Sequence, residues 1–222
     1  MFFDRLKLHY KKLLIIIIPL FVLMVVALFL AYSSIVSSLG ASNSSKVNKS
    51  YDIDSMNYHL RGNATDYQVE LFKELEKAVN EGDDLKIAEC VAKNYVADVY
   101  TWTNKQGKWD VGGMSFVYSR YNNSIYYEIK DKVYSLYAKT KEEFGEDALI
   151  EVTNVEVEKS SKDSELYEVE GKQYESYYVK CTLTLDSKID KIKGYFTHHN
   201  AFTIIKNTDK DGRFEIVVSY GD

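Results

Sequence analysis

The chain has 222 residues, a formal net charge of −5 at pH 7 and 14% aromatic residues, among them 19 tyrosines. This length suits one globular domain with additional segments, and the acidic balance lacks the basic surface that nucleic-acid binding requires. The chain has two cysteines and no CxxC pattern or Cys/His cluster, which argues against a structural zinc site. No motif predicts a cofactor.

Residues 13–32 form the most apolar stretch of the chain, an uncharged run with a single proline, Pro19. As a helix, about 19 of these residues span about 28 Å, close to the roughly 30 Å hydrocarbon core of a membrane. Residues 1–12 carry four basic residues and one acidic residue, whereas residues 32–40 carry no charge. The positive-inside rule then predicts a single-pass protein of the cell membrane with a cytoplasmic N-terminus and an extracytoplasmic C-terminal part.

A cleaved signal peptide is the alternative interpretation of this stretch, with small residues for a cleavage site at 38–41. The apolar run is longer than the about 7–15 residues of a secretory signal, which favours an uncleaved signal-anchor. Beyond residue 32 the chain has 24 basic and 32 acidic residues. Contact with membrane lipid is therefore expected through residues 13–32 alone, without adhesion to anionic headgroups.

Residues 33–65 are rich in serine and asparagine and lack sustained periodicity, which predicts a flexible tether. The expected organisation is thus a cytoplasmic tail at 1–12, a transmembrane helix at 13–32, the tether at 33–65 and an extracytoplasmic domain at 66–222.

The first half of that domain shows helical periodicity in three places. A helix is expected at 66–81, ended by Gly82, and a second is expected to begin at a cap formed by Asp83 or Asp84. The apolar positions of the first are Val69, Phe72, Leu75 and Val79, and those of the second are Leu85, Ala88, Val91, Tyr95, Val99 and Trp102.

A third helix is expected from a cap at Asn123 or Ser124 to Gly145. Its expected inward positions are Ile125, Ile129, Val133 and Leu136.

After Gly145 the apolar period changes from 3.6 to 2, which predicts strands. The expected strands are 148–158, 174–186, 194–206 and 213–220, with a polar turn at 160–164 and a tight turn at 207–212. A phase slip at Thr153–Asn154 predicts a bulge. One polar face per strand and short connections indicate an antiparallel sheet, and helices followed by strands indicate the α+β class.

The order of elements over residues 66–222 resembles the nuclear transport factor 2-like (cystatin-like) cone. The second helix with its Tyr95–Tyr100 end, the Asp110–Gly113 turn and the terminal strands carry this resemblance. It implies about three helices packed on a curved four-stranded antiparallel sheet.

With its short tail and single span, the whole chain is similar to the bitopic scaffold component of type IV secretion and conjugation systems. The resemblance implies self-association and contact with other envelope proteins. Better-known members carry an Asn-Pro-x-Gly turn in the exported domain, whereas the only proline here is Pro19.

Two kinds of binding residue can be named on this fold. A pocket for a small apolar or peptide ligand would be walled by Trp102, Trp109, Phe116 and Tyr178. A protein interface would use tyrosines, which are enriched at interfaces, although core packing accounts for a tyrosine equally well. The tyrosines of the crowded region are Tyr118, Tyr121, Tyr126, Tyr127, Tyr134 and Tyr137. Of these, Tyr118, Tyr121, Tyr127 and Tyr134 are the expected interface residues.

An enzyme is a further alternative, because some cones are isomerases or dehydratases. Its acid–base groups would come from Asp98, Asp110, Tyr95, Tyr100 and either His198 or His199. The competing interpretation makes Asp98 a helix-surface residue and Asp110 a turn residue.

No metal site is expected at the adjacent histidines, because neighbouring strand residues face opposite sides of a sheet. The two cysteines, Cys90 and Cys181, could form an exported disulfide or remain two buried thiols. The main expectation is a non-enzymatic, membrane-anchored interaction module of a bacterial cell envelope.

Overall fold

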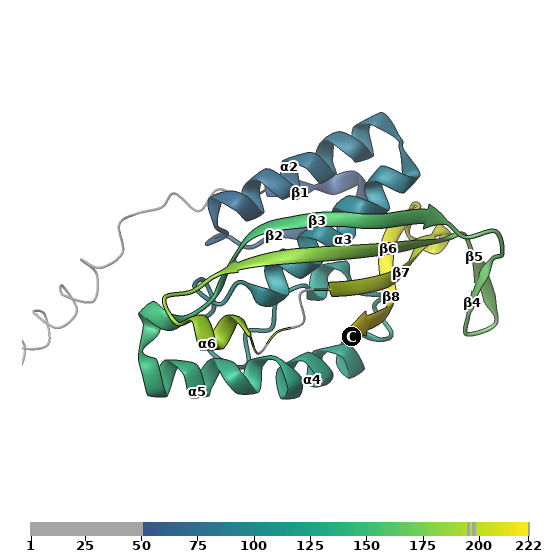
Figure 1. Ribbon diagram of the computed structural model, residues 1–222. Coiled ribbons are helices and arrows are strands. Elements are labelled where there is room, and N and C mark those ends of the chain that lie inside the picture. The colour runs from purple at the N-terminus through teal and green to yellow at the C-terminus, as the bar shows by residue number, and fades with distance from the viewer. Residues whose placement is uncertain (1–50, 195, 197–198, 222) are drawn as a thin grey trace, which may run out of the picture. The chain divides into compact units, whose positions relative to one another are not determined.

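The computed structural model describes residues 51–194, 196 and 199–221. They belong to one compact unit, Lys49–Asp222, shown in Figure 1. The expected tail at 1–12, the membrane span at 13–32, the alternative cleavage site and most of the tether lie outside the described residues. Within the described residues, no helix combines the length and the apolar character that a membrane span needs.

The unit belongs to the α+β class, as expected. Its first half holds the hairpin strands β1 (Tyr51–Ile53) and β2 (Tyr58–Leu60) and the helices α2 (Asp66–Glu81), α3 (Asp84–Tyr100), α4 (Asn122–Lys132) and α5 (Tyr134–Phe144). Its second half holds β3 (Glu151–Lys162), β4 (Tyr167–Val169), β5 (Lys172–Tyr174), β6 (Ser176–Asp186), the short α6 (Asp190–Lys193), β7 (His199–Asn207) and β8 (Arg213–Gly221).

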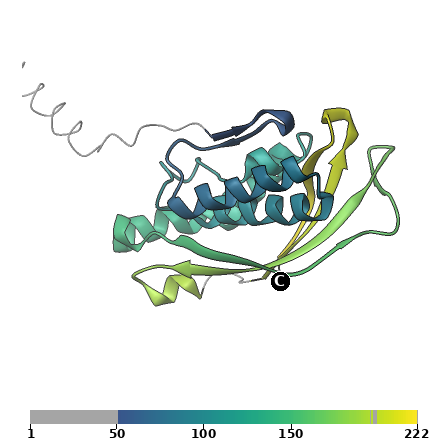
Figure 2. The same cartoon turned by 90° about the horizontal axis from the view of Figure 1, so that it is seen from above.

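The main sheet has four antiparallel strands in the order β3-β6-β7-β8. Seen from above in Figure 2, the sheet bends around the helices, with β3 and β6 along one side and β7 and β8 turning up at one end. The expected bulge is confirmed as a register shift between Val152 and Asn154, and a second shift follows between Val157 and Lys159. Such shifts and the charged side chains of β3 protect this edge strand from pairing with other chains.

Helix α3 is the centre of the core, with buried residues on nearly all sides. It packs against α2 and against β3 and β6 of the sheet. The sequence predicted a single apolar face, but Ile87, Cys90 and Val96 outside that face are also buried. Alanines such as Ala88 and Ala92 let the neighbouring elements approach the helix axis from several directions.

The expected third helix is two helices that meet at Val133. The predicted stripe does pack on the core, with Ile129 buried and Ile125, Val133 and Leu136 partly buried. Tyr134 and Tyr137, which the sequence did not assign to that stripe, are also buried. The expected cap was also wrong, because α4 begins at Asn122 and the Ser124 hydroxyl donates to the carbonyl of Tyr121.

The tether prediction was too long, because residues 51–60 form an ordered hairpin that packs on the domain. Tyr58 is fully buried, and its hydroxyl donates to the Phe214 carbonyl at 2.7 Å and accepts from the Phe214 N–H at 3.1 Å. The guanidinium of Arg213 lies over its ring, 4.7 Å from the centroid. Strands of three residues give too little alternation to be found in a sequence.

The turn expected at 160–164 is also displaced, because β3 continues to Lys162 and a small hairpin, β4–β5, follows. This hairpin turns at Glu170–Gly171, where both residues have positive φ. It folds back on the main sheet through a second apolar cluster made of Tyr118, Val169, Tyr174, Ile205 and Val217. The tight turn at 207–212 is confirmed as the connection between β7 and β8.

Both cysteines are free and buried. Burial raises the pKa of Cys90 to about 11 and that of Cys181 to about 12, so both are protonated thiols at neutral pH. We therefore expect a chromogenic disulfide reagent to modify neither thiol in the native chain and both after unfolding in urea. Rapid modification of either thiol without denaturant would contradict their burial.

Candidate functional site

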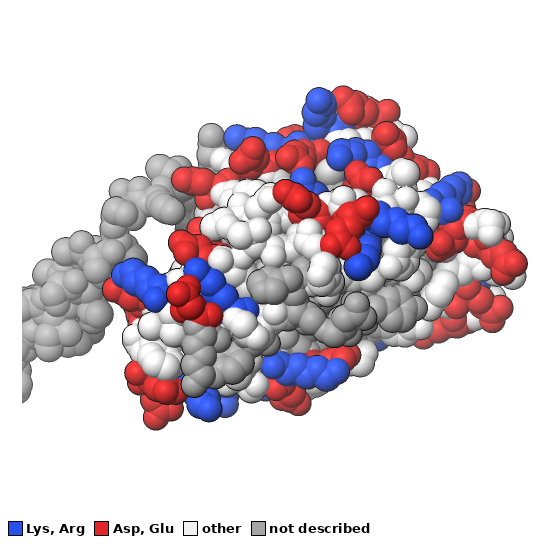
Figure 3. Space-filling view, viewed as in Figure 1, with Lys and Arg blue, Asp and Glu red and all other residues white. Residues whose placement is uncertain are grey.

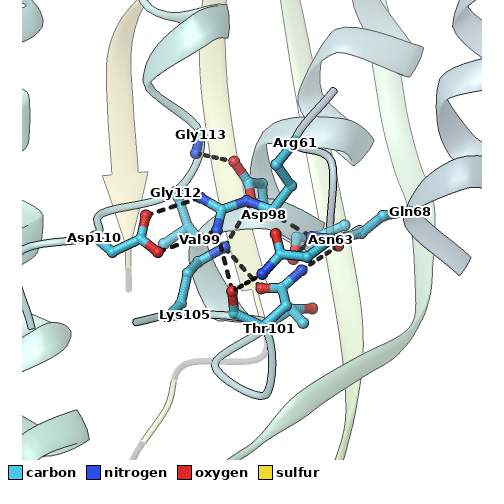
Figure 4. A network of polar contacts seen from close by, with 12 residues as sticks. Arg61, Asn63, Gln68, Asp98, Val99, Thr101, Lys105, Asp110, Gly112 and Gly113 are labelled. Atoms are coloured by element: carbon cyan, nitrogen blue, oxygen red, sulfur yellow. Dashed lines mark hydrogen bonds and ion pairs between the residues drawn. The ribbon is translucent and has the colours of Figure 1, made fainter. Parts of the chain in front are cut away.

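Four charged side chains meet where the β1–β2 hairpin, the end of α3 and the loop 101–113 come together (Figure 4). They are Arg61 after β2, Asp98 in the last turn of α3, and Lys105 and Asp110 in the loop. The Lys105 side chain is 0% exposed, and those of Arg61, Asp98 and Asp110 are at most 20% exposed. We call these four residues the ion network.

Asp98 lies at the centre of the ion network. One carboxylate oxygen accepts from the Lys105 ammonium at 2.7 Å and faces the Arg61 Nε at 2.9 Å. The other accepts from the Gly113 N–H at 2.7 Å. Burial would raise the pKa of Asp98, but the charges of Lys105 and Arg61 outweigh it and hold the pKa below its usual range. Asp98 is thus an ionised carboxylate that is largely shielded from solvent, and not the helix-surface residue that the sequence allowed.

Arg61 joins the hairpin to the loop. Its two terminal nitrogens donate to the two carboxylate oxygens of Asp110 at 3.2 and 3.3 Å, and one also donates to the Asn104 carbonyl at 3.3 Å. Asp110 in turn accepts from the Gln106 N–H at 3.0 Å. Burial acts to raise the pKa of Asp110, but the hydrogen bonds from Arg61 and Gln106 lower it overall. Such a forked contact is specific to a guanidinium.

Uncharged side chains complete the connections around the ion network. Thr65 and Gln68 form a capping box at the start of α2, and the Gln68 amide also donates to the Ala97 carbonyl at 3.3 Å. Gln68 accepts from the Asn104 amide at 2.7 Å. Asn63 donates to the Asn104 carbonyl at 2.7 Å. The loop is therefore bonded to the hairpin, to α2 and to α3 together.

The loop crosses α3 at Gly112 and Gly113. A Cβ atom at Gly112 would lie far inside van der Waals contact with the Asp98 carbonyl oxygen, and one at Gly113 would lie 2.7 Å from the Tyr95 ring. Gly113 also has a φ of +81°, which favours glycine, whereas Gly112 does not have a positive φ. The Gly112 N–H donates to the buried Tyr134 hydroxyl at 3.0 Å.

We expect Gly112→Ala to destabilise the domain by about 2–4 kcal/mol, because the loop must move off α3 and lose contacts of the ion network. Thermal or urea unfolding of the full-length chain would measure the loss. Gly82→Ala is the matched control, because a Cβ there has no neighbour within 4 Å and the cost is about 1 kcal/mol of backbone strain. Equal losses in the two variants would contradict the close approach.

Trp109 stands on the outer side of this loop and is 59% exposed. Its carbonyl accepts from the Tyr126 hydroxyl of α4 at 3.0 Å. The rings of Tyr126 and Tyr127 pack edge to face at 5.3 Å, and the Lys130 ammonium lies 5.8 and 5.6 Å from their centroids. Tyr127 is also 59% exposed. We call Trp109, Tyr126, Tyr127 and Lys130 the Trp109 surface.

The four residues expected to wall a ligand pocket are not brought together. Trp102 is fully buried against the rings of Tyr134, Tyr137 and Phe196, so side chains fill the space beside it. Phe116 is buried against Tyr58, and Trp109 is exposed. Tyr178 lines a shallow hollow of about 460 Å³ on the sheet with Lys180 and His199.

The four tyrosines expected at an interface divide between core and surface. Tyr134 is fully buried and Tyr118 is buried in the second cluster, so neither is free to contact a partner. Tyr121 is partly buried against Tyr118, at 5.4 Å between ring centroids. Only Tyr127 is strongly exposed, and it belongs to the Trp109 surface.

The other residues named for an enzyme are Tyr95, Tyr100 and one of the two histidines, and the structure describes three of these four. Tyr95 is buried, and Tyr100 is partly buried and donates to Asn200 at 3.2 Å. His199 is exposed and pairs with Glu158 at 2.9 Å, while His198 lies outside the described residues. Among the residues that the structure describes, no three His, Cys, Asp or Glu side chains are placed to hold a metal ion.

Sequence reasoning missed Arg61 and Lys105. Arg61 lay within the expected tether, and one arginine there carries no periodic signal. The pattern Thr65-x-x-Gln68 was a readable capping-box signal for the start of α2.

No family model, curated protein or solved structure matches the chain. Its function therefore has to be argued from the arrangement of its own residues.

Proposed function

We propose that the chain is a membrane-anchored, non-enzymatic interaction module of a bacterial cell envelope. Residues 13–32 anchor it, and the domain faces the extracytoplasmic side, where the Trp109 surface docks another envelope protein. The observation that carries this proposal is an exposed tryptophan on a loop and an exposed tyrosine on a helix, which the hydrogen bond from Tyr126 to the Trp109 carbonyl holds together.

The residue types of the Trp109 surface support a docking role. Trp and Tyr are enriched among the residues that carry most of the energy of protein interfaces. The large apolar side chains exposed among the described residues are Trp109, Tyr127, Phe144 and Leu166. Two of these four belong to the Trp109 surface, which concentrates apolar area at one place on a polar exterior.

The ionisable groups support a non-enzymatic role. The buried carboxylate Asp98 is engaged by Lys105, Arg61 and Gly113 and has a lowered pKa, so it is a poor general base near neutral pH. On the face shown in Figure 3, acidic and basic side chains are interspersed, which fits a protein surface better than a nucleic-acid-binding one.

The bent antiparallel sheet with helices against it is compatible with the nuclear transport factor 2-like cone. We propose that fold, and with it a place in a type IV secretion or conjugation complex, as the most specific form of this function. A small apolar or peptide ligand in the cone is less favoured, because Trp102 and Phe116 are packed in the core.

The topology can be tested by adding protease to intact spheroplasts that contain the full-length chain with a C-terminal tag. The proposal predicts that the tag is lost before lysis while the N-terminal tail stays protected. A tag that survives until lysis would contradict the extracytoplasmic location.

A further inference from the structure

We propose that the β1–β2 hairpin controls the Trp109 surface, and that Arg61 is the positioning residue that connects them. The inference rests on the proposed docking function of that surface. It adds a coupling between the surface and the segment that leads to residues 13–32.

The hairpin is held on the domain at two places that lie close together in sequence. At one, Tyr58 is buried and exchanges two hydrogen bonds with Phe214 of β8. Arg213 supports this place by donating to the Asn57 carbonyl at 2.8 Å. At the other, Arg61 enters the ion network. The first contact fixes the hairpin to the sheet, whereas the second reaches the loop that carries Trp109.

The path from Arg61 to the Trp109 surface is short. Arg61 holds both carboxylate oxygens of Asp110, the residue directly after Trp109. Asp110 accepts from the Gln106 N–H and donates its own N–H to the Gly107 carbonyl at 3.0 Å, which closes the turn around Trp109. The backbone of Gly107 lies against the indole, because a Cβ atom there would be 2.9 Å from the indole nitrogen. The turn that presents the indole is therefore closed by a carboxylate that the hairpin holds.

The remaining contacts of the loop do not replace Arg61. Lys105 binds Asp98 and the Asn104 side chain, and Tyr137 donates to the Lys105 carbonyl at 3.1 Å. These contacts fix the start of the loop, five residues before Asp110. On the other side, the Gly113 N–H donates to Asp98 and the Gly112 N–H donates to the Tyr134 hydroxyl. The Trp109 carbonyl accepts from the Tyr126 hydroxyl, but none of these three bonds reaches the Asp110 carboxylate that closes the turn. If Arg61 moved away with the hairpin, Asp110, Asp98 and the Asn104 carbonyl would each lose a contact to its guanidinium. The contacts at the two ends of the loop do not involve Arg61.

Coupling of this kind is reciprocal. A partner bound to the Trp109 surface would stabilise the hairpin in its position on the domain. Displacing the hairpin from the domain would in turn lower the affinity of the Trp109 surface for the partner. Tyr51 begins the hairpin, so a load on the preceding segment reaches the Tyr58 contact first and Arg61 next, before it reaches the loop.

Fluorine NMR of the full-length chain in detergent, with 5-fluorotryptophan at both tryptophans, tests the coupling. Trp109→Phe assigns the two resonances. Arg61→Gln should shift or broaden the Trp109 resonance and leave the buried Trp102 resonance unchanged, which also reports that the core is folded. Arg61→Lys should produce an intermediate change, because an ammonium cannot hold both oxygens of Asp110. Lys77→Gln, which removes an exposed ion pair with Glu81 on α2, is the matched control without effect.

An unchanged Trp109 resonance in Arg61→Gln, with Trp102 also unchanged, would overturn the inference. A shift of both resonances would also count against it, because Arg61 would then act on the whole core. Capture of the partner separates the coupling from the docking function. Arg61→Gln should weaken capture at least about fivefold, although Trp109 itself is unchanged in this variant. If Trp109→Ala leaves capture unchanged, the docking function fails even where the resonance moves.

Discussion

Replacing Asp98 by alanine is expected to destabilise the domain by about 3–5 kcal/mol, the largest loss for any single residue of the ion network. The reason is that Lys105, whose side chain is 0% exposed, would lose the carboxylate that offsets the effect of burial on its ammonium, since burial lowers the pKa of Lys105. The Gly113 N–H would also lose its acceptor. Urea unfolding of the full-length chain with Trp109→Phe, in which Trp102 is the remaining fluorescent tryptophan, measures the change.

Two controls separate this charge effect from a loss of packing. The double variant Asp98→Ala/Lys105→Met should recover a large part of the loss, because it removes the unpaired charge with its partner. Glu128→Ala breaks the exposed pair between Glu128 and Lys132 and should change stability by no more than about 0.5 kcal/mol. A loss below about 1 kcal/mol in Asp98→Ala would show that the ion network does not hold the loop.

The second large effect concerns binding. Trp109→Ala is expected to weaken the interaction with the partner by about 2 kcal/mol, or roughly 30-fold, with little change in folding stability. An exposed indole contributes little to the stability of the core, but it buries a large apolar area when a partner binds. Tyr127→Ala should have a smaller effect of the same sign. Affinity capture from membranes, calibrated by titration, measures the ratio.

Leu166→Ala is the matched control, since Leu166 is 54% exposed and lies between β3 and β4, away from α4 in the chain. It should leave capture unchanged. Should Leu166→Ala weaken capture and Trp109→Ala leave it intact, the docking surface would lie on the β4–β5 side of the domain instead.

The elements with a strong and regular pattern could be predicted from the sequence. Helix α2 begins and ends at the expected residues, because Gly82 adopts the left-handed conformation that ends it. The existence of the four long strands and the bulge near Thr153 follow from alternation and its phase slip. The strand expected at 194–206 begins later, at His199, because the short helix α6 and its C-cap Gly194 precede it. These features depend on neighbours in sequence, which a pattern records.

The features that were missed depend on tertiary contacts. Helix α3 is buried on nearly all sides, and the two tyrosines after Val133 turn inward only because α5 packs on the core. The β1–β2 hairpin is ordered by Tyr58 and Phe214, which are 156 residues apart.

The candidate site also depends on tertiary contacts that the sequence pattern does not record. Trp109 and Tyr127 were both named from the sequence, but one was assigned to a pocket and the other to an interface. Only the hydrogen bond from Tyr126 to the Trp109 carbonyl places their exposed rings on one surface. Composition does not show that Trp102 and Tyr134 are buried while Trp109 and Tyr127 are exposed, because aromatic residues are used both in cores and at interfaces.

The most direct test of the docking surface is photocrosslinking in intact cells. A photoreactive phenylalanine analogue replaces Trp109 in one full-length variant and Leu166 in another. If the Trp109 surface docks a partner, we expect a discrete crosslinked product with one envelope protein from position 109 and none from position 166. Products of equal yield at both positions, or none at 109 in cells where the chain is correctly inserted, would contradict it.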